Sequence, residues 1–241
     1  MNTSRSSPPP SSSADTFGPP EYARWRQSTL GRIVEEIERE AIFELAGDLQ
    51  GQRVLDLGCG DGTYAIGAAF RGAEAVGVDL SDAMLTAARK RGENCGVPVE
   101  WCLARAESLP FRPGSFDVAI AVTLLCLVPK PLDVVAEAGR VLRPGGVLIL
   151  GELGRYSSWA LWRRMRGWRG SPLWSRAHFW SFREICGLMR QAGIEAVESR
   201  GCVHFPPIPF VARAFSKCDR AFRFLGQAGA AFLAVKGEKP R

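Results

Sequence analysis

The chain has 241 residues, of which 46% are hydrophobic, and its formal net charge is +6. This length suits one domain with a sizeable core. No window approaches the about 18 consecutive apolar residues that span a bilayer, so we expect a cytoplasmic protein. Seven scattered cysteines without a CxxC pair argue against a disulfide framework or a zinc site, and two histidines argue against a histidine metal centre. We therefore expect free thiols and no metal.

The charges are unevenly distributed. Residues 1–154 carry 15 basic and 20 acidic side chains, a balance of −5, whereas residues 155–241 carry 16 and 5, a balance of +11. The C-terminal third is expected either to meet an anionic partner or to present a solvated basic face.

The first twenty residues are mostly Ser, Pro and small polar residues. Without an apolar core they predict a disordered tail over 1–20 rather than a signal peptide. Residues 21–241 are predicted to form a single domain with its core at 50–155.

Hydrophobic periodicity predicts the elements that follow. Apolar residues at steps of three and four predict an amphipathic helix over 28–46, ended by Gly47. Ser81 is a predicted N-cap, and Ser181 with Glu184 is spaced as a capping box. The predicted strands are 53–58, 73–80, 99–104, 116–124, 147–153, 194–203 and 229–237. The helices predicted between them are 63–71, 82–91, 131–142 and 181–193. A short helix or loop is predicted at 108–111, and a turn at 143–146. This alternation indicates βαβ units and a parallel sheet that binds ligands beyond the carboxyl ends of its strands.

The stretch "VLDLGCGDGTYAIG" (54–67) places a glycine-rich loop at the exit of the first strand. It departs from the dinucleotide fingerprint, because Thr63 stands where the third glycine belongs. Asp56 and Asp61 would repel a pyrophosphate and attract a ligand that carries positive charge.

Asp79 ends the second predicted strand, 21 residues after Gly58. This interval is typical of a carboxylate that accepts hydrogen bonds from ribose hydroxyls, although a helix-approach cap is the alternative. A ribose, an adenosine and a cationic amino-acid end together describe S-adenosylmethionine.

Four segments carry a family resemblance: "VLDLGCGDG", "GVDLSDAML", "ARAESLPFRPGSFDVAIA" and "AGRVLRPGGVLIL". In this order they resemble the motifs of class I S-adenosylmethionine-dependent methyltransferases, in particular the small-molecule branch that includes ubiquinone and menaquinone biosynthesis enzymes. The resemblance covers about residues 50–155. It implies an α/β, doubly wound, Rossmann-like, seven-stranded and mostly parallel sheet with an antiparallel last strand. It also implies S-adenosyl-L-methionine as cofactor and a small, apolar or aromatic methyl acceptor.

The resemblance also implies the cofactor-binding residues. Asp56 would hold the amino group and Asp79 the ribose, while Leu80 and Met84 would lie near the adenine. The full implied set is Asp56, Gly58, Gly60, Asp79, Leu80, Met84, Ala106, Glu107, Val122 and Thr123.

Arg105 departs from the family pattern, which commonly has an Asp there that accepts from the adenine amino group. An arginine cannot accept a hydrogen bond, so the contact is lost or passes to Glu107 or a backbone carbonyl. This departure motivates one alternative, a protein that binds S-adenosylmethionine without turnover. A dehydrogenase is a further alternative, against which the broken fingerprint counts.

Methyl transfer from a sulfonium is a direct displacement with a neutral leaving group. It needs alignment of donor and acceptor, and a general base only where the acceptor carries a proton. Candidate bases are Glu152, His178, His204 and Tyr22, each with a packing or surface role as the alternative. Tyr22 and Trp25 lie in a stretch that folds over the cofactor in similar enzymes.

Residues 156–180 and 205–226 are predicted to lie on the substrate side. Five of the seven tryptophans fall between 154 and 180. On a predicted helix in this segment, large apolar side chains recur every three residues: Trp159, Trp162, Met165 and Trp168. Arginines lie between and after them: Arg163, Arg164, Arg166 and Arg169. Three interpretations stay open: a lid over the acceptor, peripheral docking on an anionic membrane, and an apolar face packed on the sheet. A nucleic-acid acceptor is disfavoured because the fourth strand leads into "TLLCLVPKP" rather than an N/D-P-P-Y signature. A lipid or RNA methyltransferase therefore remains a lesser alternative.

Overall fold

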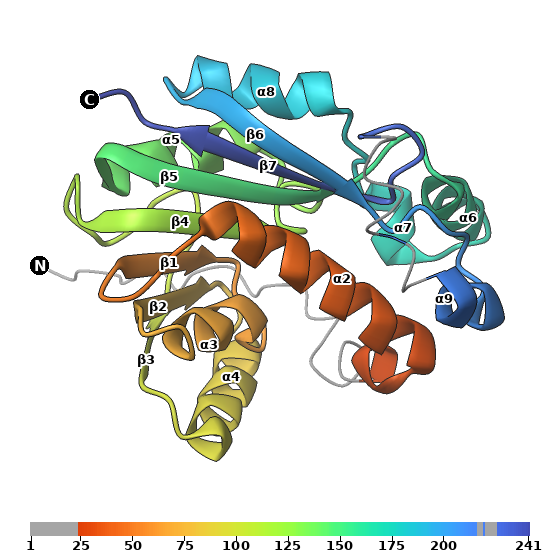
Figure 1. Ribbon diagram of the computed structural model, residues 1–241, viewed down its shortest axis with the longest axis horizontal. Helices are drawn as coiled ribbons and strands as arrows, with labels where there is room; N and C mark the ends of the chain where they lie inside the picture. Colours follow the sequence, from red (N-terminus) through yellow and green to blue (C-terminus); the bar gives the residue numbers. More distant parts are fainter. Residues whose placement is uncertain (1–23, 216–218, 220–225) are drawn as a thin grey trace, which may run out of the picture.

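The computed structural model describes residues 24–215, 219 and 226–241. Its centre is a seven-stranded sheet in the order β3-β2-β1-β4-β5-β7-β6 (Figure 1). β7 runs antiparallel to both of its neighbours, and every other pairing is parallel. The strands are β1 (Arg53–Leu57), β2 (Glu74–Asp79), β3 (Val99–Leu103), β4 (Phe116–Val122), β5 (Leu142–Leu153), β6 (Glu195–Cys202) and β7 (Phe232–Glu238). The predicted doubly wound sheet with an antiparallel last strand is confirmed.

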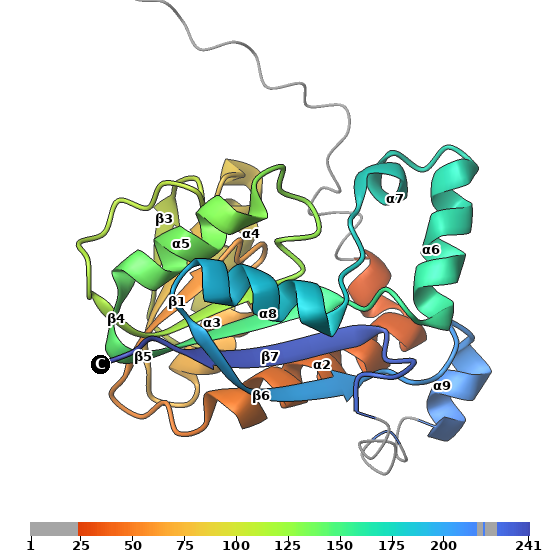
Figure 2. The same cartoon turned by 90° about the horizontal axis from the view of Figure 1, so that it is seen from above.

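Helices cover both faces of the sheet. On one face lie α2 (Thr29–Ala46) and α3 (Thr63–Ala69), with α4 (Asp82–Cys95) beside α3; on the other lie α5 (Pro131–Val141) and α8 (Phe182–Gln191). The remaining helices, α6 (Ser158–Trp168), α7 (Pro172–Arg176) and α9 (Pro209–Phe215), gather beyond the carboxyl ends of the parallel strands (Figures 1 and 2). The segment predicted to lie on the substrate side therefore stands at the edge where such sheets bind ligands.

Two apolar clusters hold the layers together. Leu55 and Leu57 belong to the cluster beneath α5 and α8, which includes Ile185. The second cluster lies beneath α2 and α3 and includes Ile42 and Phe232. A sheet buried on both faces requires the nearly continuous apolar strands that the sequence shows.

Local signals predict several helix boundaries correctly. The Ser81 side chain caps α4, and Ser181 and Glu184 form the predicted capping box at α8. The strand predicted to run to residue 124 ends at Val122, because Thr123 adopts a left-handed φ of 50°. β5 begins at Leu142 rather than at the predicted residue 147. Residues 143–146, where a turn was predicted, form an irregular stretch of this strand, across which the register to β4 shifts and Gly145 has a φ of 75°. No helix forms at 108–111, which is a loop.

Other structural statements concern only the described ranges. Within them no helix combines the length and apolarity needed to cross a bilayer. The same ranges contain no group of three His, Cys, Asp or Glu side chains that could hold a metal ion. The predicted tail at 1–20, Tyr22 and much of 216–225 lie outside the described residues.

Two glycines should respond in opposite directions to the same substitution. A Cβ on Gly151 in β5 would clash with Cζ of the buried Phe232 and lie 2.9 Å from Cδ1 of Ile42, whereas Gly187 in α8 has nothing within 4 Å of a Cβ. We expect Gly151→Ala to destabilise the fold by about 1–3 kcal/mol through overpacking. Gly187→Ala should stabilise it by about 0.5–1 kcal/mol, because alanine loses less backbone entropy in a helix. Urea unfolding measures both, and equal effects would contradict the packing at Gly151.

Candidate functional site

The glycine-rich loop after β1 needs left-handed backbone at three positions. Gly58, Gly60 and Gly62 have φ values of 64°, 54° and 85°, a region that favours glycine. A Cβ on Gly58 would lie 2.7 Å from a methyl carbon of Leu124, whereas nothing lies within 4 Å of a Cβ on Gly60. Gly58 therefore makes room for Leu124, and only Gly60 borders open space into which a ligand can approach the backbone.

Asp79, at the end of β2, is tied to the backbone on two sides. Its Oδ2 accepts the N–H of Gly60 at 2.9 Å, and its Oδ1 accepts the N–H of Ser81 at 2.8 Å. An ionised carboxylate has about four acceptor positions, so roughly two remain for the hydroxyls of a ribose. The two N–H groups thus fix the orientation of a carboxylate that is still able to accept from a ligand.

Asp56 lies deeper, in β1. Its side chain is buried, and its Oδ2 accepts the N–H of Ala65 in the first turn of α3 at 2.9 Å. This bond replaces the side-chain cap that Gly62, the N-cap residue of α3, cannot supply. Burial raises the pKa of Asp56 to about 7, against the lowering effect of the Ala65 bond and with further raising by Asp79 and Asp61. The protonation of this carboxyl therefore changes near neutral pH.

Asp61, by contrast, is neutralised by two arginines. Its carboxylate pairs with Arg26 at 2.7 Å and with Arg91 of α4 at 3.1 Å. Both arginines also donate to Thr63, whose hydroxyl in turn donates to Glu35 of α2 at 3.0 Å. These ion pairs offset the charge of Asp61 and so weaken the predicted repulsion of a phosphate by this residue. Asp56 and Asp79 have no such arginine partner among the described residues and contribute more of the loop's negative character.

The expected adenine side presents apolar surface next to Asp79. Leu80 is 62% exposed, Met84 is partly buried, and Ala106 lies in a turn closed by the N–H of Ser108. Leu103 of β3, which pairs with Asp79 of β2, is also exposed. The sequence around Leu103 did not indicate that it would lie beside Asp79.

Arg105 turns toward solvent at this turn. Its guanidinium lies 3.4 Å from a carboxylate oxygen of Glu107, and its side chain is 58% exposed. The carboxylate that was expected to replace the family's Asp is therefore partly engaged by Arg105 itself.

The turn after β4 carries backbone strain. Thr123 has a φ of 50°, which is uncommon for a residue other than glycine, and its N–H donates to the Gly151 carbonyl at 2.7 Å. The next residue, Leu124, is the one that fills the space at Gly58. The strained residue thus aligns the end of β4 with the glycine-rich loop, as strained residues at functional sites often do.

Glu152 supports this turn from below. Its Oε1 accepts the N–H of Leu125 at 2.7 Å, while its Oε2 is buried without a hydrogen-bond partner. Burial raises the pKa of this carboxyl to about 8, against the lowering effect of its hydrogen bonds. With 0% exposure, Glu152 is placed to position the turn rather than to reach an acceptor.

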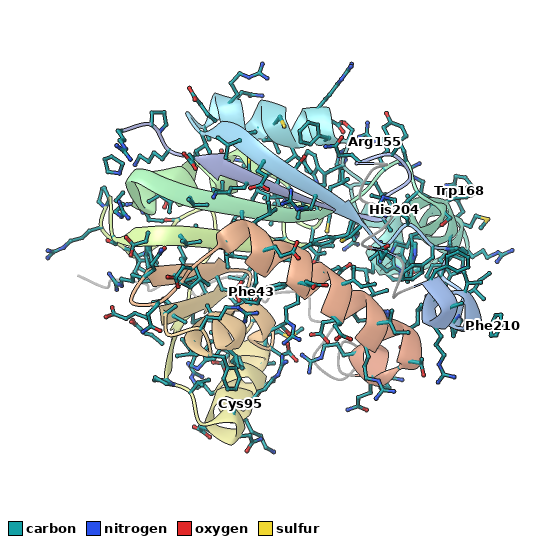
Figure 3. All side chains as sticks on the ribbon, in the orientation of Figure 1. Phe43, Cys95, Arg155, Trp168, His204 and Phe210 are labelled. Carbon is teal, nitrogen blue, oxygen red and sulfur yellow. The ribbon has the colours of Figure 1, made fainter. Side chains whose placement is uncertain are left out.

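The other candidate bases are differently placed. His204, labelled in Figure 3, follows β6. Its side chain is buried, with ring nitrogens 3.5 Å from Asp219 and 3.3 Å from the Gly226 carbonyl, a placement that favours its packing role. His178 lines a cavity of about 410 Å³ together with Arg155, and its ring nitrogen Nε2 lies 3.2 Å from that guanidinium. Trp25 packs beside the cluster beneath α2.

The aromatic stripe of α6 divides into two parts. Trp159 is 2% exposed and donates to the Phe205 carbonyl at 2.8 Å, so it belongs to the core. Trp162 is partly buried, whereas Met165 and Trp168 are exposed. The prediction of an apolar face packed on the sheet is thus right for Trp159 and wrong for Trp168.

Sequence reasoning did not single out Glu38. It lies on the core side of α2, between Val34 and Ile42, which are 1% and 0% exposed. Burial raises its pKa to about 8, Arg163 lowers it, and Glu35 raises it. The sequence did indicate that Glu38 lies on the buried side of the helix, because apolar residues stand one turn before it and one turn after it.

The residues present fit S-adenosylmethionine. The backbone at Gly60 is open, Asp79 retains acceptor capacity, and an apolar side chain at Leu80 lies beside it. The Oδ1 of Asp56 makes no hydrogen bond to any described residue, which leaves it available to a cationic group.

Comparisons with known proteins identify the family of the chain. Residues 55–150 match the family described as a methyltransferase domain. A ubiquinone biosynthesis O-methyltransferase of Bordetella avium is 34% identical over 179 residues, which cover 72% of this chain and 74% of that protein.

Solved structures show the same fold. A SAM-dependent methyltransferase of Thermotoga maritima, described as a possible histamine N-methyltransferase, is 29% identical with a TM-score of 0.69, covering 91% of this chain and 95% of that one. Magnesium protoporphyrin IX methyltransferase of Synechocystis, solved with bound SAH, superposes with a TM-score of 0.69. The match covers 92% of this chain and 96% of that one at 16% identity, so it supports the fold alone.

Binding of a ligand with an ammonium group should depend on the ionisation of Asp56. Because its folded pKa is raised to about 7, the carboxylate that attracts a cation forms only as the pH rises through that value. We expect S-adenosylmethionine to bind about tenfold more tightly at pH 8 than at pH 6, following the ionised fraction. Titration calorimetry across this range measures the effect.

Asp56→Asn is the matched variant, because its amide oxygen can still accept from Ala65. We expect this variant to fold, bind weakly and lose the pH dependence. A wild-type affinity that stays constant from pH 6 to pH 8 would contradict the role of Asp56.

Proposed function

Since the chain belongs to the class I S-adenosylmethionine-dependent methyltransferases, we propose that it methylates a small, apolar or aromatic acceptor by direct displacement. The enzyme class and the cofactor follow from the family. The single observation that carries the site is the carboxylate of Asp79, held by the N–H groups of Gly60 and Ser81 next to open space.

In this proposal each part of the cofactor meets a different strand end. Asp79 accepts from the ribose hydroxyls, and Asp56 attracts the ammonium group through its Oδ1. The adenine lies against Leu80 and Met84, near the backbone of Ala106 and the side chain of Glu107. The methionine portion follows the loop from Gly58 to Gly60 and the end of β4 at Val122 and Thr123.

The protein's contribution to the reaction is alignment. The bound cofactor supplies an electrophilic methyl group on a sulfonium. The strained turn at Thr123 and the glycine-rich loop hold the donor side rigid, and α2, α6 and α7 close the acceptor side. Such positioning is worth several powers of ten in rate when reacting atoms are held in line.

Aromatic residues dominate the acceptor side. Trp159 and Trp174 both lie near the guanidinium of Arg163, and Trp162 stacks edge-on against Trp159 with ring centroids 6.2 Å apart. Trp159 is packed in the core, whereas Trp174 lines the cavity beside His178, where its ring would favour a flat, apolar acceptor over a strongly hydrated one.

We also propose that apolar acceptors are collected from an anionic membrane surface. Leu161 and Trp168 of α6 and Phe210 of α9 are 57%, 80% and 81% exposed, and Figure 3 shows Trp168 and Phe210 at the outer end of the molecule. Exposed aromatic residues beside arginines suit the boundary between headgroups and acyl chains.

Loss of the ribose contact should abolish cofactor binding. Two hydrogen bonds to a charged acceptor contribute about 1.5–3 kcal/mol each, so Asp79→Ala should weaken S-adenosylmethionine binding by about 100-fold or more. Asp82→Ala, which removes an exposed carboxylate three residues along, should bind normally. Calorimetry with both variants, supported by thermal melts, provides the measurement.

Turnover is tested by offering labelled S-adenosylmethionine with small aromatic hydroxyl, amine and thiol compounds, and with RNA. We expect label in one of the small aromatic classes and none after Asp79→Ala. Unchanged cofactor affinity after Asp79→Ala, or label confined to RNA, would contradict the proposal.

Membrane docking predicts binding to vesicles that contain about one third anionic phospholipid, weakened by salt. The double variant Trp168→Ser with Phe210→Ser should sediment with them at least tenfold less. Phe70→Ser, which removes an exposed ring at the end of α3, is the control. Equal sedimentation of all three proteins would reject this surface.

A further inference from the structure

A cavity of about 410 Å³ lies between α6, α7 and the segment that leads into α8. Its volume is within the range of small-molecule sites. The walls combine aromatic side chains, among them Trp168 and Trp174, with the arginines Arg155 and Arg164. No acid is among the described residues that line the cavity. The cavity therefore suits a flat ligand that carries negative charge.

The cavity adjoins the turn after β4, which borders the glycine-rich loop. The backbone N–H of His178, in the cavity wall, donates to the Cys126 carbonyl at 2.9 Å. Two residues before Cys126 stands Leu124, which occupies the space where a Cβ on Gly58 would lie. One turn of chain thus joins the cavity wall to the loop proposed to hold the methyl donor.

Arg155 is already engaged by its neighbours. Its guanidinium pairs with the Glu184 carboxylate at 2.7 Å, and its Nε donates to the Phe179 carbonyl at 2.9 Å. The terminal nitrogen that faces Glu184 also lies 3.2 Å from Nε2 of His178. Because a guanidinium has donors and no acceptor, Nε2 accepts this hydrogen bond. Arg155 therefore orients the imidazole, while Glu184 balances its charge.

The contact with Arg155 selects the tautomer of His178. A neutral imidazole that accepts at Nε2 carries its proton at Nδ1. Burial lowers the pKa of His178. The charge of Glu184 raises this pKa, whereas the charges of Arg155 and Arg164 lower it. At neutral pH the ring therefore has no free lone pair for a base, and it offers an N–H at Nδ1 that bonds to no described residue.

Arg164 supplies the positive charge that no acid balances. It makes no ion pair or hydrogen bond with any residue that the structure describes, and its Cζ lies 5.1 Å from the ring centroid of Phe179. Stacking on a ring uses a face of the guanidinium and leaves its N–H groups free. Two such N–H groups match the two oxygens of a carboxylate, which they can bind in parallel.

We propose that this cavity binds the methyl acceptor by a carboxylate, held by Arg164 and by the Nδ1–H of His178, with the ring of the acceptor against Trp174. The inference rests on the proposed function and narrows its acceptor to an aromatic carboxylic acid. Arg164 and His178 are the binding residues, and Arg155 is a positioning residue that acts through His178.

The charge of the ligand is tested with 2-naphthoate and its neutral amide, 2-naphthamide, which share one ring system. Titration calorimetry is run on the full chain, both free and saturated with S-adenosylhomocysteine. We expect wild type to bind the carboxylate about tenfold or more tightly than the amide, as hydrogen bonds to a charged group imply. Arg164→Met should lose this preference, whereas Arg169→Met, at the exposed end of the same helix, should retain it. Thermal melts confirm that the variants are folded.

The ring of the ligand is tested with cyclohexanecarboxylate and inorganic phosphate, which carry negative charge without an aromatic face. Each should bind more weakly than 2-naphthoate, because neither can stack on Trp174. Phosphate that displaces 2-naphthoate at equal concentration would indicate a site for a bare anion, such as a lipid headgroup, and would overturn the aromatic acid.

The role of Arg155 has a spectroscopic readout. The chain has only two histidines, so nitrogen NMR of the imidazole rings distinguishes their tautomers, and His178→Gln identifies the signals of His178. We expect Nδ1–H at His178 in wild type, and a shift toward Nε2–H with weaker binding of 2-naphthoate in Arg155→Met. An Nε2–H tautomer in wild type would overturn the donor role of His178.

The acceptor itself is tested by transfer of label from S-adenosylmethionine to hydroxybenzoates and aminobenzoates, each compared with its amide. We expect kcat/KM to be about tenfold or more higher for the acids, in line with their binding, and Arg164→Met to remove the difference. Equal labelling of acids and amides by wild type would overturn the acceptor class. A wild type that binds no S-adenosylmethionine refutes the proposed function, whereas one that binds it but does not prefer 2-naphthoate to 2-naphthamide overturns this inference alone.

Discussion

The carboxylate of Asp79 is the interaction on which the ligand edge of this protein depends. It accepts from Gly60 and Ser81, and so joins the end of β2 to the glycine-rich loop and to the start of α4. Without it, the left-handed backbone at Gly60 would have no fixed partner on the ligand side. Because two backbone donors already hold the carboxylate, a ligand that binds it meets a preorganised group and orders little else.

The helices beyond the sheet edge divide the acceptor side into an inner and an outer surface. Trp159 and Arg163 of α6 face inward, where Trp159 is anchored to the Phe205 carbonyl. Trp168, two turns further along the same helix, is 80% exposed. One short helix therefore packs one face into the core and presents an exposed aromatic side chain to the outside.

Much of the fold was predictable because its signals are local. The order of strands and helices follows from apolar runs separated by helical patterns, and the caps at Ser81 and Ser181 follow from residue type at fixed spacing. Residues 143–146 carry the local turn signals of a proline and two glycines. The strand nevertheless continues through them, with a shift in its register to β4 and a left-handed Gly145.

The site was less predictable because its partners are distant in the chain. Asp61 stands in the quoted loop, but Arg26 and Arg91, which neutralise it, come from two different elements that no spacing rule connects. Glu38 shows a different limit. Its place on the apolar side of α2 was readable, but only the fold shows that the charge of Arg163, far along the chain, acts on the pKa of Glu38.

The acids at this edge share one physical consequence. Burial raises the pKa of Asp56 to about 7 and those of Glu38 and Glu152 to about 8. When folding raises the pKa of a carboxyl, its contribution to the free energy of unfolding is fully present below the unfolded pKa. That contribution is lost as the pH rises from the unfolded pKa through the folded one. The folded chain at neutral pH therefore holds acids close to the point where ionisation becomes costly. A cation beside Asp56 offsets that cost, as the charge of Arg163 does for Glu38. Binding of a cation and release of a proton at this edge are consequently linked. The burial that lowers the stability of the fold at high pH also makes these carboxylates better proton acceptors near neutral pH.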